Sequence, residues 1–271
     1  DMLIESDAGQ FLRATSDLSF PEITTQWRDF CNNAERVCES FDRSLRIGPG
    51  INPYEFTRRL GASAPGTLDV FVDTGCALPW LMTGFVPKSG QRIMHDLNNT
   101  AMGWSLPATI GGSIASPERP NVCVIGDGSL MMSMHDLITL SANNPRARVI
   151  LIDNSGYSMI RQTQDQWLAS AYHSSSQEGG LHFPGYAQLA ASTNYDYLNL
   201  GPDDDIDVIL QKFWTNEQPV FLRVEIDPAW RVVPHVKFGR PNEDMEPLLP
   251  RDLFSSMMLV EPLPQSLRDD A

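Results

Sequence analysis

A Gly-Asp-Gly-Ser sequence, residues 126–129, follows directly after a short apolar run. Asn154 follows the next apolar run along the chain and lies 27 positions after Asp127. Short continuous apolar runs are typical of strands that are buried on both faces of a parallel sheet. If the two runs form neighbouring parallel strands, Asp127 and Asn154 meet at one edge of the sheet although a helix separates them in the sequence. The pattern therefore favours an α/β fold.

This edge of the sheet also carries the chemistry of a magnesium site. Magnesium prefers octahedral oxygen ligands and binds through one or two carboxylates together with phosphate groups. The Asp127 carboxylate, the Asn154 amide oxygen and the Gly156 carbonyl can supply three ligands, and a diphosphate can supply two more. A lone Gly-Asp-Gly is equally typical of a tight turn, but the spacing and the flanking strands favour the metal and diphosphate site.

The other residues of the motif suit an anionic ligand. Gly126 and Gly128 allow a sharp turn and a close approach of the backbone to phosphate. Ser129 is expected to open a helix over 130–142, whose free N–H groups and positive dipole end favour an anion.

The rest of the chain continues the alternation of strands and helices. Six strands are predicted at 68–73, 91–94, 121–125, 148–152, 195–200 and 220–226. Helices are predicted at 76–83, 101–115, 130–142, 184–192 and 205–215. This order predicts a three-layer α/β fold with a six-stranded, mainly parallel sheet covered by helices on both faces.

Three segments are expected along the chain. Residues 1–50 hold one or two surface helices and a linker, residues 51–233 form the main domain, and residues 234–271 form an extended proline-rich tail. Within the main domain, the polar and glycine-rich stretch 174–180 is predicted to be a mobile loop.

Composition excludes several classes of protein. The net charge of −14 argues against nucleic-acid binding, which depends on basic patches. No apolar stretch approaches the roughly 20 residues needed to span a bilayer, and no export signal is evident. The four cysteines form no Cys-x-x-Cys pair or disulfide framework, so a cytoplasmic location is predicted.

Two further segments, together with residues 126–129 and 154–158, resemble motifs of a known protein family. They are the Asp-x-Gly segment at 73–75, followed by Cys76 and Ala77, and the segment at 98–108. From about Asp73 to Pro234 the chain resembles the carboxyl-terminal, diphosphate-binding domain of acetolactate-synthase-like thiamine diphosphate enzymes. Residues 4–11 resemble the end of the middle domain of these enzymes, which implies that residues 1–50 are the end of a middle domain and a helical linker. The resemblance implies that the chain binds thiamine diphosphate and Mg²⁺. It assigns these residues to the cofactor: Gly75, Cys76, Ala77, Thr100, Ala101, Met102, Gly126, Asp127, Gly128, Ser129, Asn154, Gly156, Tyr157 and Ser158.

Three residues receive catalytic roles from the same resemblance. Met102 corresponds to the residue that wedges between the two cofactor rings, although core packing is the usual role of a methionine. The Thr100 carbonyl would accept a hydrogen bond from the 4′-amino group of the cofactor. His95, next to this segment, is the histidine we would test for proton transfer. Cys76 is either a phosphate neighbour that contacts the ligand through its backbone or a packed small residue.

The resemblance also indicates what this chain lacks. Family enzymes use a glutamate from a separate pyrimidine-binding domain, supplied across a subunit interface, and no matching segment occurs here. The resemblance therefore implies a partner domain or subunit, a homo- or hetero-oligomer, and a chain that is one part of a split enzyme or a fragment of a longer one. It leaves open a flavin (FAD) in the absent middle domain.

The substrate side is predicted from residues 159–164. Met159 and Ile160 would contact the acyl group of a 2-oxo acid donor, with pyruvate as the first candidate. Thr163 stands where the synthases carry tryptophan, which leaves room for a large carbonyl acceptor. The tail at 239–251 resembles that of a subgroup in which some members add a two-carbon unit from pyruvate to a keto-sugar nucleotide, and a proline-rich clasp that buries the tail is an equal alternative. The resemblance thus implies a thiamine diphosphate- and Mg²⁺-dependent decarboxylase-carboligase that transfers a two-carbon unit from the 2-oxo acid to a carbonyl acceptor. The alternatives are an acetolactate synthase, a simple 2-oxo acid decarboxylase and a non-catalytic assembly subunit with the same fold.

Overall fold

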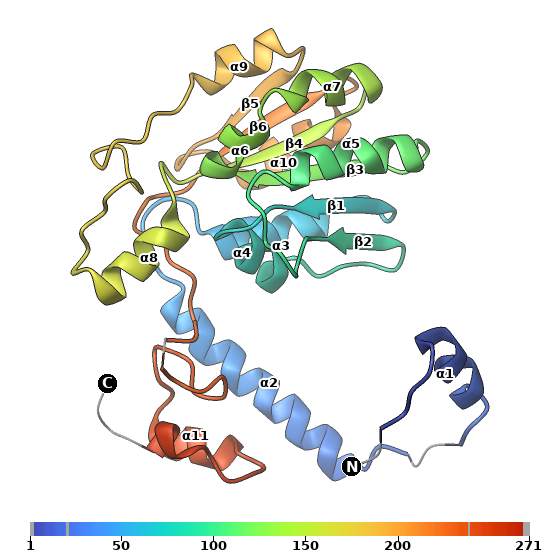
Figure 1. Cartoon of the computed structure of the whole chain (residues 1–271), viewed down its shortest axis with the longest axis vertical. Helices are drawn as coiled ribbons and strands as arrows, with labels where there is room; N and C mark the ends of the chain where they lie inside the picture. The colour runs from blue at the N-terminus through green and yellow to red at the C-terminus, as the bar shows by residue number, and fades with distance from the viewer. Residues whose placement is uncertain (1–2, 20–21, 238, 268–271) are drawn as a thin grey trace.

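Six parallel strands form the centre of the structure, a computed structural model that describes residues 3–19, 22–237 and 239–267 (Figure 1). Their order in the sheet is β2-β1-β3-β4-β6-β5. Their bounds are Leu68–Val72 (β1), Gln91–Met94 (β2), Asn121–Gly126 (β3), Arg148–Asp153 (β4), Asp196–Leu200 (β5) and Val220–Glu225 (β6). All six predicted strands are therefore confirmed, and so is the predicted fold class.

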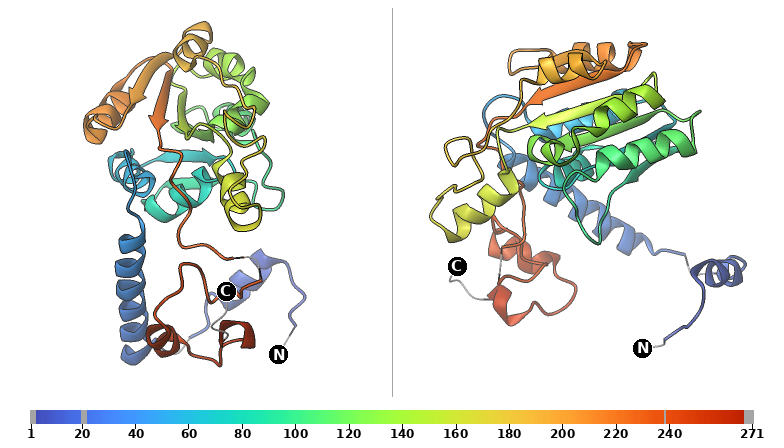
Figure 2. Two further views of the ribbon diagram at one scale, coloured as in Figure 1. Left: turned by 90° about the vertical axis from the view of Figure 1, so that its left-hand side faces the viewer. Right: turned by 45° about the horizontal axis from the view of Figure 1, so that its top comes forward.

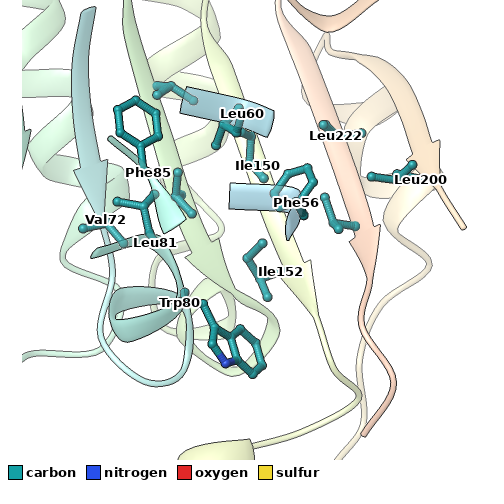
Figure 3. Packing of buried hydrophobic residues seen from close by; sticks show 14 of the residues in the cluster. Phe56, Leu60, Val72, Trp80, Leu81, Phe85, Ile150, Ile152, Leu200 and Leu222 are labelled. Carbon is teal, nitrogen blue, oxygen red and sulfur yellow. The ribbon is translucent and has the colours of Figure 1, made fainter. Parts of the chain in front are cut away.

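Helices cover both faces of the sheet because successive side chains of each buried strand point to opposite faces. Val122 and Ile150 pack on the face with α3 (Pro53–Ser63), α4 (Ala77–Gly84) and α10 (Ile206–Thr215). Figure 3 shows this core, where Phe56 and Leu60 of α3 lie over β4. Cys123 and Val149 pack on the other face. That face carries α5 (Ser105–Ala115), α6 (Asp127–Ser133), α7 (Asp136–Asn143) and α9 (Tyr186–Ser192).

The ends of the chain lie outside this layered domain. Helix α2 (Thr25–Leu45) projects away from the sheet, and α1 (Ala8–Thr15) stands apart from the rest (Figures 1 and 2). The tail returns alongside α2 and contains α11 (Arg251–Met257) and a 3₁₀ turn at Pro264–Leu267. No helix in the described part of the chain is long and apolar enough to cross a membrane.

Several local predictions were wrong. The tail is not wholly extended, since it contains α11 and the 3₁₀ turn. Helix α3 was not foreseen, although Asn52 caps it by accepting hydrogen bonds from the N–H groups of Tyr54 and Glu55, and Pro53 occupies its first turn. Parts of the predicted amino-terminal segment and tail, residues 1–2, 20–21, 238 and 268–271, lie outside the described residues.

The predicted helices around the motifs also differ from the structure. The helix predicted at 101–115 begins only at Ser105. The helix predicted at 130–142 begins at Asp127 and is divided into α6 and α7, because the Leu137 N–H bonds the Met134 carbonyl only three residues back. In the loop 174–180, predicted to be mobile, Ser175 is buried and its hydroxyl contacts the Gln164 side chain.

Asp69 of β1 connects three segments through its carboxylate. Arg92 of β2 donates to it through Nε at 2.8 Å, and Arg119, before β3, donates through Nη2 at 2.6 Å. Burial alone would raise the pKa of Asp69, but the two guanidinium groups outweigh burial and lower the pKa to about 2. The ionised carboxylate therefore stabilises the fold, in full above its unfolded pKa near 3.8 and less as the pH falls toward 2.

We expect Asp69→Asn to lower the free energy of unfolding at pH 7 by about 2 kcal/mol, since it removes the charge that both arginines contact. The difference from the unsubstituted chain should narrow between pH 4 and pH 3, because the unfolded carboxyl takes up a proton there. Urea unfolding of the full chain at pH 7, 4 and 3 measures both effects. The exposed Asp203→Asn is the matched control, and a pH-independent loss would contradict the electrostatic cause.

Candidate functional site

The candidate site lies where the carboxyl ends of β1, β3 and β4 meet. From β1 the chain crosses to β2 at one edge and then returns past β1 to β3, so the strand order reverses between β1 and β3. Ligands in open α/β sheets bind outside the carboxyl ends of the strands at such a reversal. Asp127 follows β3 and Asn154 follows β4, and the two strands are hydrogen-bonded neighbours.

The structure brings Asp127 and Asn154 to one cavity of about 400 Å³. Fifteen of the residues expected to contact cofactor or donor line it, and the lining adds Thr74, Met132 and Ile152, which were not foreseen. The complete lining is Thr74, Gly75, Cys76, Ala77, Thr100, Met102, Gly126, Asp127, Gly128, Ser129, Met132, Ile152, Asn154, Gly156, Tyr157, Ser158, Met159 and Ile160.

The Asp127 carboxylate joins the loops that follow the two strands. One carboxylate oxygen accepts the Gly128 N–H at 2.7 Å, and the other accepts the Gly156 N–H at 2.8 Å. Burial and the nearby Asp153 carboxylate raise the pKa of Asp127, and the two N–H groups only partly oppose this shift. A cation at this position would favour the ionised form of Asp127.

The side-chain oxygen of Asn154 is the second candidate ligand at this cavity. Its Oδ1 atom is buried and has no hydrogen-bond partner among the described residues. Buried polar atoms are normally satisfied, so this atom is suited to a ligand outside the chain. One carboxylate, one free amide oxygen and the Gly156 carbonyl form an all-oxygen donor set that fits a hard cation such as Mg²⁺. No group of three His, Cys, Asp or Glu side chains suited to a metal occurs in the residues that the structure covers, so phosphate oxygens would have to complete the coordination.

Two glycines of the site stand where there is no room for a side chain. A Cβ atom on Gly128 would lie 1.9 Å from the Tyr157 ring, and one on Gly156 would lie 2.3 Å from the Ser175 carbonyl oxygen. Gly156 also has a φ of 150°, which side chains rarely adopt. The loops therefore approach each other closely around the cavity.

Asp73 explains why residues 101–104 are not helical. This buried carboxylate, at the end of β1, accepts the Gly103 N–H at 3.0 Å and the Ser105 N–H at 2.8 Å. Thr100 and Gly103 take positive φ values of 49° and 80°. The segment is thereby held as a loop that directs Thr100 and Met102 toward the cavity.

Arg161 of α8 (Ser158–Trp167) is a positioning residue that the sequence did not reveal. It is buried, and its Nη2 atom donates to the Asn154 carbonyl at 2.8 Å and to the Ser158 hydroxyl at 2.6 Å. It thus holds the loop that carries Asn154. A buried arginine in a polar helix has no distinctive sequence pattern, so only the structure shows this role.

Cys76 is a packed residue with an unreactive thiol. It is 4% exposed, and burial raises the pKa of its thiol to about 12. Its side chain belongs to the hydrophobic core below the cavity, which agrees with the packing alternative.

Three residues assigned from the sequence do not line this cavity. His95 bonds the Val72 carbonyl through Nδ1 at 2.8 Å and lies with its ring against Trp104. Ala101 is exposed beside the cavity segment. Thr163 lies farther along α8 and lines a second cavity, which shares Met159 with the first.

The comparisons with known proteins agree with this fold. The family model described as "Thiamine pyrophosphate enzyme, C-terminal TPP binding domain" matches residues 73–224. The chain is 31% identical over 195 residues to the acetolactate synthase isozyme 1 large subunit of Escherichia coli (strain K12), covering 72% of this chain and 34% of that protein. It is 28% identical over 254 residues to the acetolactate synthase large subunit of Parasynechococcus marenigrum (strain WH8102), covering 90% and 39% respectively.

A solved structure shares the fold. The thiamine diphosphate-dependent 4-hydroxybenzoylformate decarboxylase of Rhodococcus jostii RHA1 superposes with a TM-score of 0.57 at 19% identity, covering 67% of this chain and 33% of that one. The chain belongs to the thiamine pyrophosphate enzyme family and resembles acetolactate synthases within it. It spans about a third of the length of these relatives.

We expect Asp127→Ala to abolish magnesium-dependent binding of thiamine diphosphate. In the variant only neutral protein oxygens remain to bind the cation. The fold should be little affected, because removal of a buried charge offsets the loss of the two hydrogen bonds that Asp127 accepts. The melting temperature without cofactor should therefore change by less than about 4 °C. Calorimetric titration and thermal melting of the complete assembly that contains this chain measure the two effects, with Asp203→Ala as control. Unchanged affinity would show that the metal assignment is wrong.

Proposed function

We propose that this chain is the diphosphate-binding part of a thiamine diphosphate- and Mg²⁺-dependent decarboxylase-carboligase that acts on a 2-oxo acid, with pyruvate as the preferred donor. The observation that carries the proposal is the cavity between Asp127, Asn154 and Met102. Its polar end, with the free Asn154 oxygen, suits a cation and a diphosphate. When bound, the cofactor supplies an electron sink for loss of CO₂ from the donor.

The groups of this chain would bind and orient the cofactor, the cation and the donor. In the proposed arrangement the N-terminal N–H groups of α6 face the diphosphate, and Asp127, Asn154 and the Gly156 carbonyl hold the cation. Met102 would contact the ring end of the cofactor, and the Thr100 carbonyl would accept a hydrogen bond there. Met159 and Ile160, which line the same cavity, exclude water around the donor's small acyl group.

A second domain completes the proposed active site. Because the chain spans about a third of its relatives, we propose that a pyrimidine-binding domain or subunit supplies the activating glutamate within a homo- or hetero-oligomer. A flavin in a middle domain is compatible with this arrangement. The cysteines, which are free at all four positions, suit a cytoplasmic setting.

We propose a carbonyl acceptor larger than pyruvate, with a keto-sugar nucleotide as the first candidate. The support is the second cavity beside Thr163, which offers about 560 Å³ next to the cofactor cavity. An acetolactate synthase or a simple decarboxylase needs no such space for its acceptor.

Titration of the complete assembly with thiamine diphosphate and Mg²⁺ tests the proposal, followed by measurement of CO₂ release from pyruvate. We expect saturable binding that requires both components and CO₂ release that depends on both. No binding at millimolar cofactor would leave a non-catalytic assembly subunit as the better interpretation.

We expect Thr163→Trp to suppress transfer to a large acceptor at least tenfold more than it suppresses CO₂ release from pyruvate. An indole at this position would fill part of the second cavity, and near-attack geometry is sensitive to displacements of about 1 Å. Both half-reactions should be measured with small aldehydes and keto-sugar nucleotides as acceptors. Thr163→Val, which adds no bulk, is the control. Equal losses in both half-reactions would show that Thr163 does not line the acceptor site.

A further inference from the structure

The second cavity lies between α8 and the chain that follows β6. The Gln162 side chain ties the two segments together, since its amide donates to the Val232 carbonyl at 3.0 Å and its oxygen accepts the Val232 N–H at 3.0 Å. Figures 1 and 2 show the segment after β6 passing beside α8 on its way to the tail. Met159 and Thr163 line the cavity from α8, and Lys237 and Arg240 line it from the tail.

The charge of this cavity is opposite to that of the chain. Its lining contains Lys237 and Arg240 but no aspartate or glutamate from the described residues, whereas the chain as a whole carries a net charge of −14. A volume of about 560 Å³ lies within the range of small-molecule sites. Two cations on one wall of such a cavity favour an anionic ligand.

Arg240 is a largely buried residue of the cavity lining. Its side chain is 7% exposed, and its Nη1 atom contacts an Asp244 carboxylate oxygen at 3.4 Å. Its Nη2 atom is buried and has no hydrogen-bond partner in the part of the chain that the structure describes. A buried, unpaired guanidinium nitrogen is costly, so a small rotation of the guanidinium that brings this nitrogen to a ligand oxygen in the cavity would be favourable.

The carboxylate partners of the two lining cations lie outside the cavity lining. Asp244 also contacts Arg251 at 2.9 Å, so one carboxylate serves two guanidinium groups. Lys237 has a carboxylate partner of its own, Glu246, at 3.3 Å. Both ion pairs are long, 3.3 Å for Lys237–Glu246 and 3.4 Å for Arg240–Asp244, and neither carboxylate lines the cavity, so the lining itself carries only positive charge.

We propose that this cavity binds the phosphate or diphosphate group of the carbonyl acceptor, through Lys237 and Arg240. The inference rests on the proposed function and assigns the acceptor side of that site. Because Met159 borders both cavities, an acceptor anchored at its phosphate end can extend its carbonyl group past Met159 toward the donor.

The reaction balances without an added oxidant or reductant. The donor loses CO₂, and the electron pair of the broken carbon–carbon bond forms the new bond to the acceptor carbonyl carbon. The acceptor oxygen then takes one proton from water. The phosphate end of the acceptor takes no part in bond making, so the cavity contributes binding energy and orientation.

Direct binding is the first test. The complete assembly, with saturating thiamine diphosphate and Mg²⁺ to fill the first cavity, is titrated with uridine diphosphate and separately with inorganic phosphate. We expect Lys237→Gln to weaken binding about tenfold, because it removes one charge-assisted contact, and Lys212→Gln on the exposed side of α10 to leave it unchanged. Tighter binding of uridine diphosphate supports a nucleoside diphosphate acceptor, and equal binding supports a phosphate monoester. No binding of either probe overturns the inference.

Kinetics with paired acceptors provides the second test. Glycolaldehyde phosphate should show a KM at least tenfold below that of glycolaldehyde. The Lys237→Gln variant should raise the KM for glycolaldehyde phosphate about tenfold, leave the KM for glycolaldehyde unchanged and change kcat little. Equal KM values for the two aldehydes would count against the inference. Absence of CO₂ release from any 2-oxo acid would instead reject the proposed function, while the binding titration would still report on the cavity.

Discussion

The Asp127 carboxylate connects the two strand ends on which the site depends. It accepts N–H groups from the loops after β3 and β4, so both loops are oriented by one side chain. Burial opposes its charge, and the chain provides no cationic side chain within hydrogen-bond or ion-pair distance of it among the described residues. The fold thus holds the Asp127 carboxylate where its negative charge is unfavourable, and a bound cation would stabilise that charge. Asn154 adds to this arrangement a buried oxygen that the chain itself leaves unpaired.

Two other contacts turn this strand edge into a cavity. Asp73 fixes the loop at 100–105 through the Gly103 and Ser105 N–H groups, and Arg161 fixes the loop that carries Asn154 through the Asn154 carbonyl. Both side chains are buried and bonded to backbone groups. The cofactor side is therefore built from backbone held by buried charges, and the apolar side chains of Met102, Met159 and Ile160 complete its wall.

Local sequence patterns predicted the strands and the motif residues, because apolar runs and glycine-rich turns act over short distances. The six strands follow from such runs, and Gly128 and Asp127 from the turn after one of them. The loop at 101–104 could not be predicted in this way, since its conformation depends on Asp73, 30 residues away. Likewise, the helical spacing of 101–115 gives no sign of where the helix starts. Arg161 and Arg240 acquire their meaning only from contacts made by tertiary packing.

Tyr54 fixes the point at which the tail leaves the domain. Its hydroxyl accepts the Val233 N–H at 2.8 Å and donates to the Val233 carbonyl at 3.0 Å, so α3 anchors the chain just before His235, Val236 and Lys237, which line the second cavity from the tail. The first cavity is formed by the ends of β1, β3 and β4, and the tail contributes nothing to its lining. Substitutions beyond Val233 can therefore remodel one cavity while the other keeps its geometry. The tail thus forms a part of the chain whose sequence can change without disturbing the strand ends that carry Asp127 and Asn154.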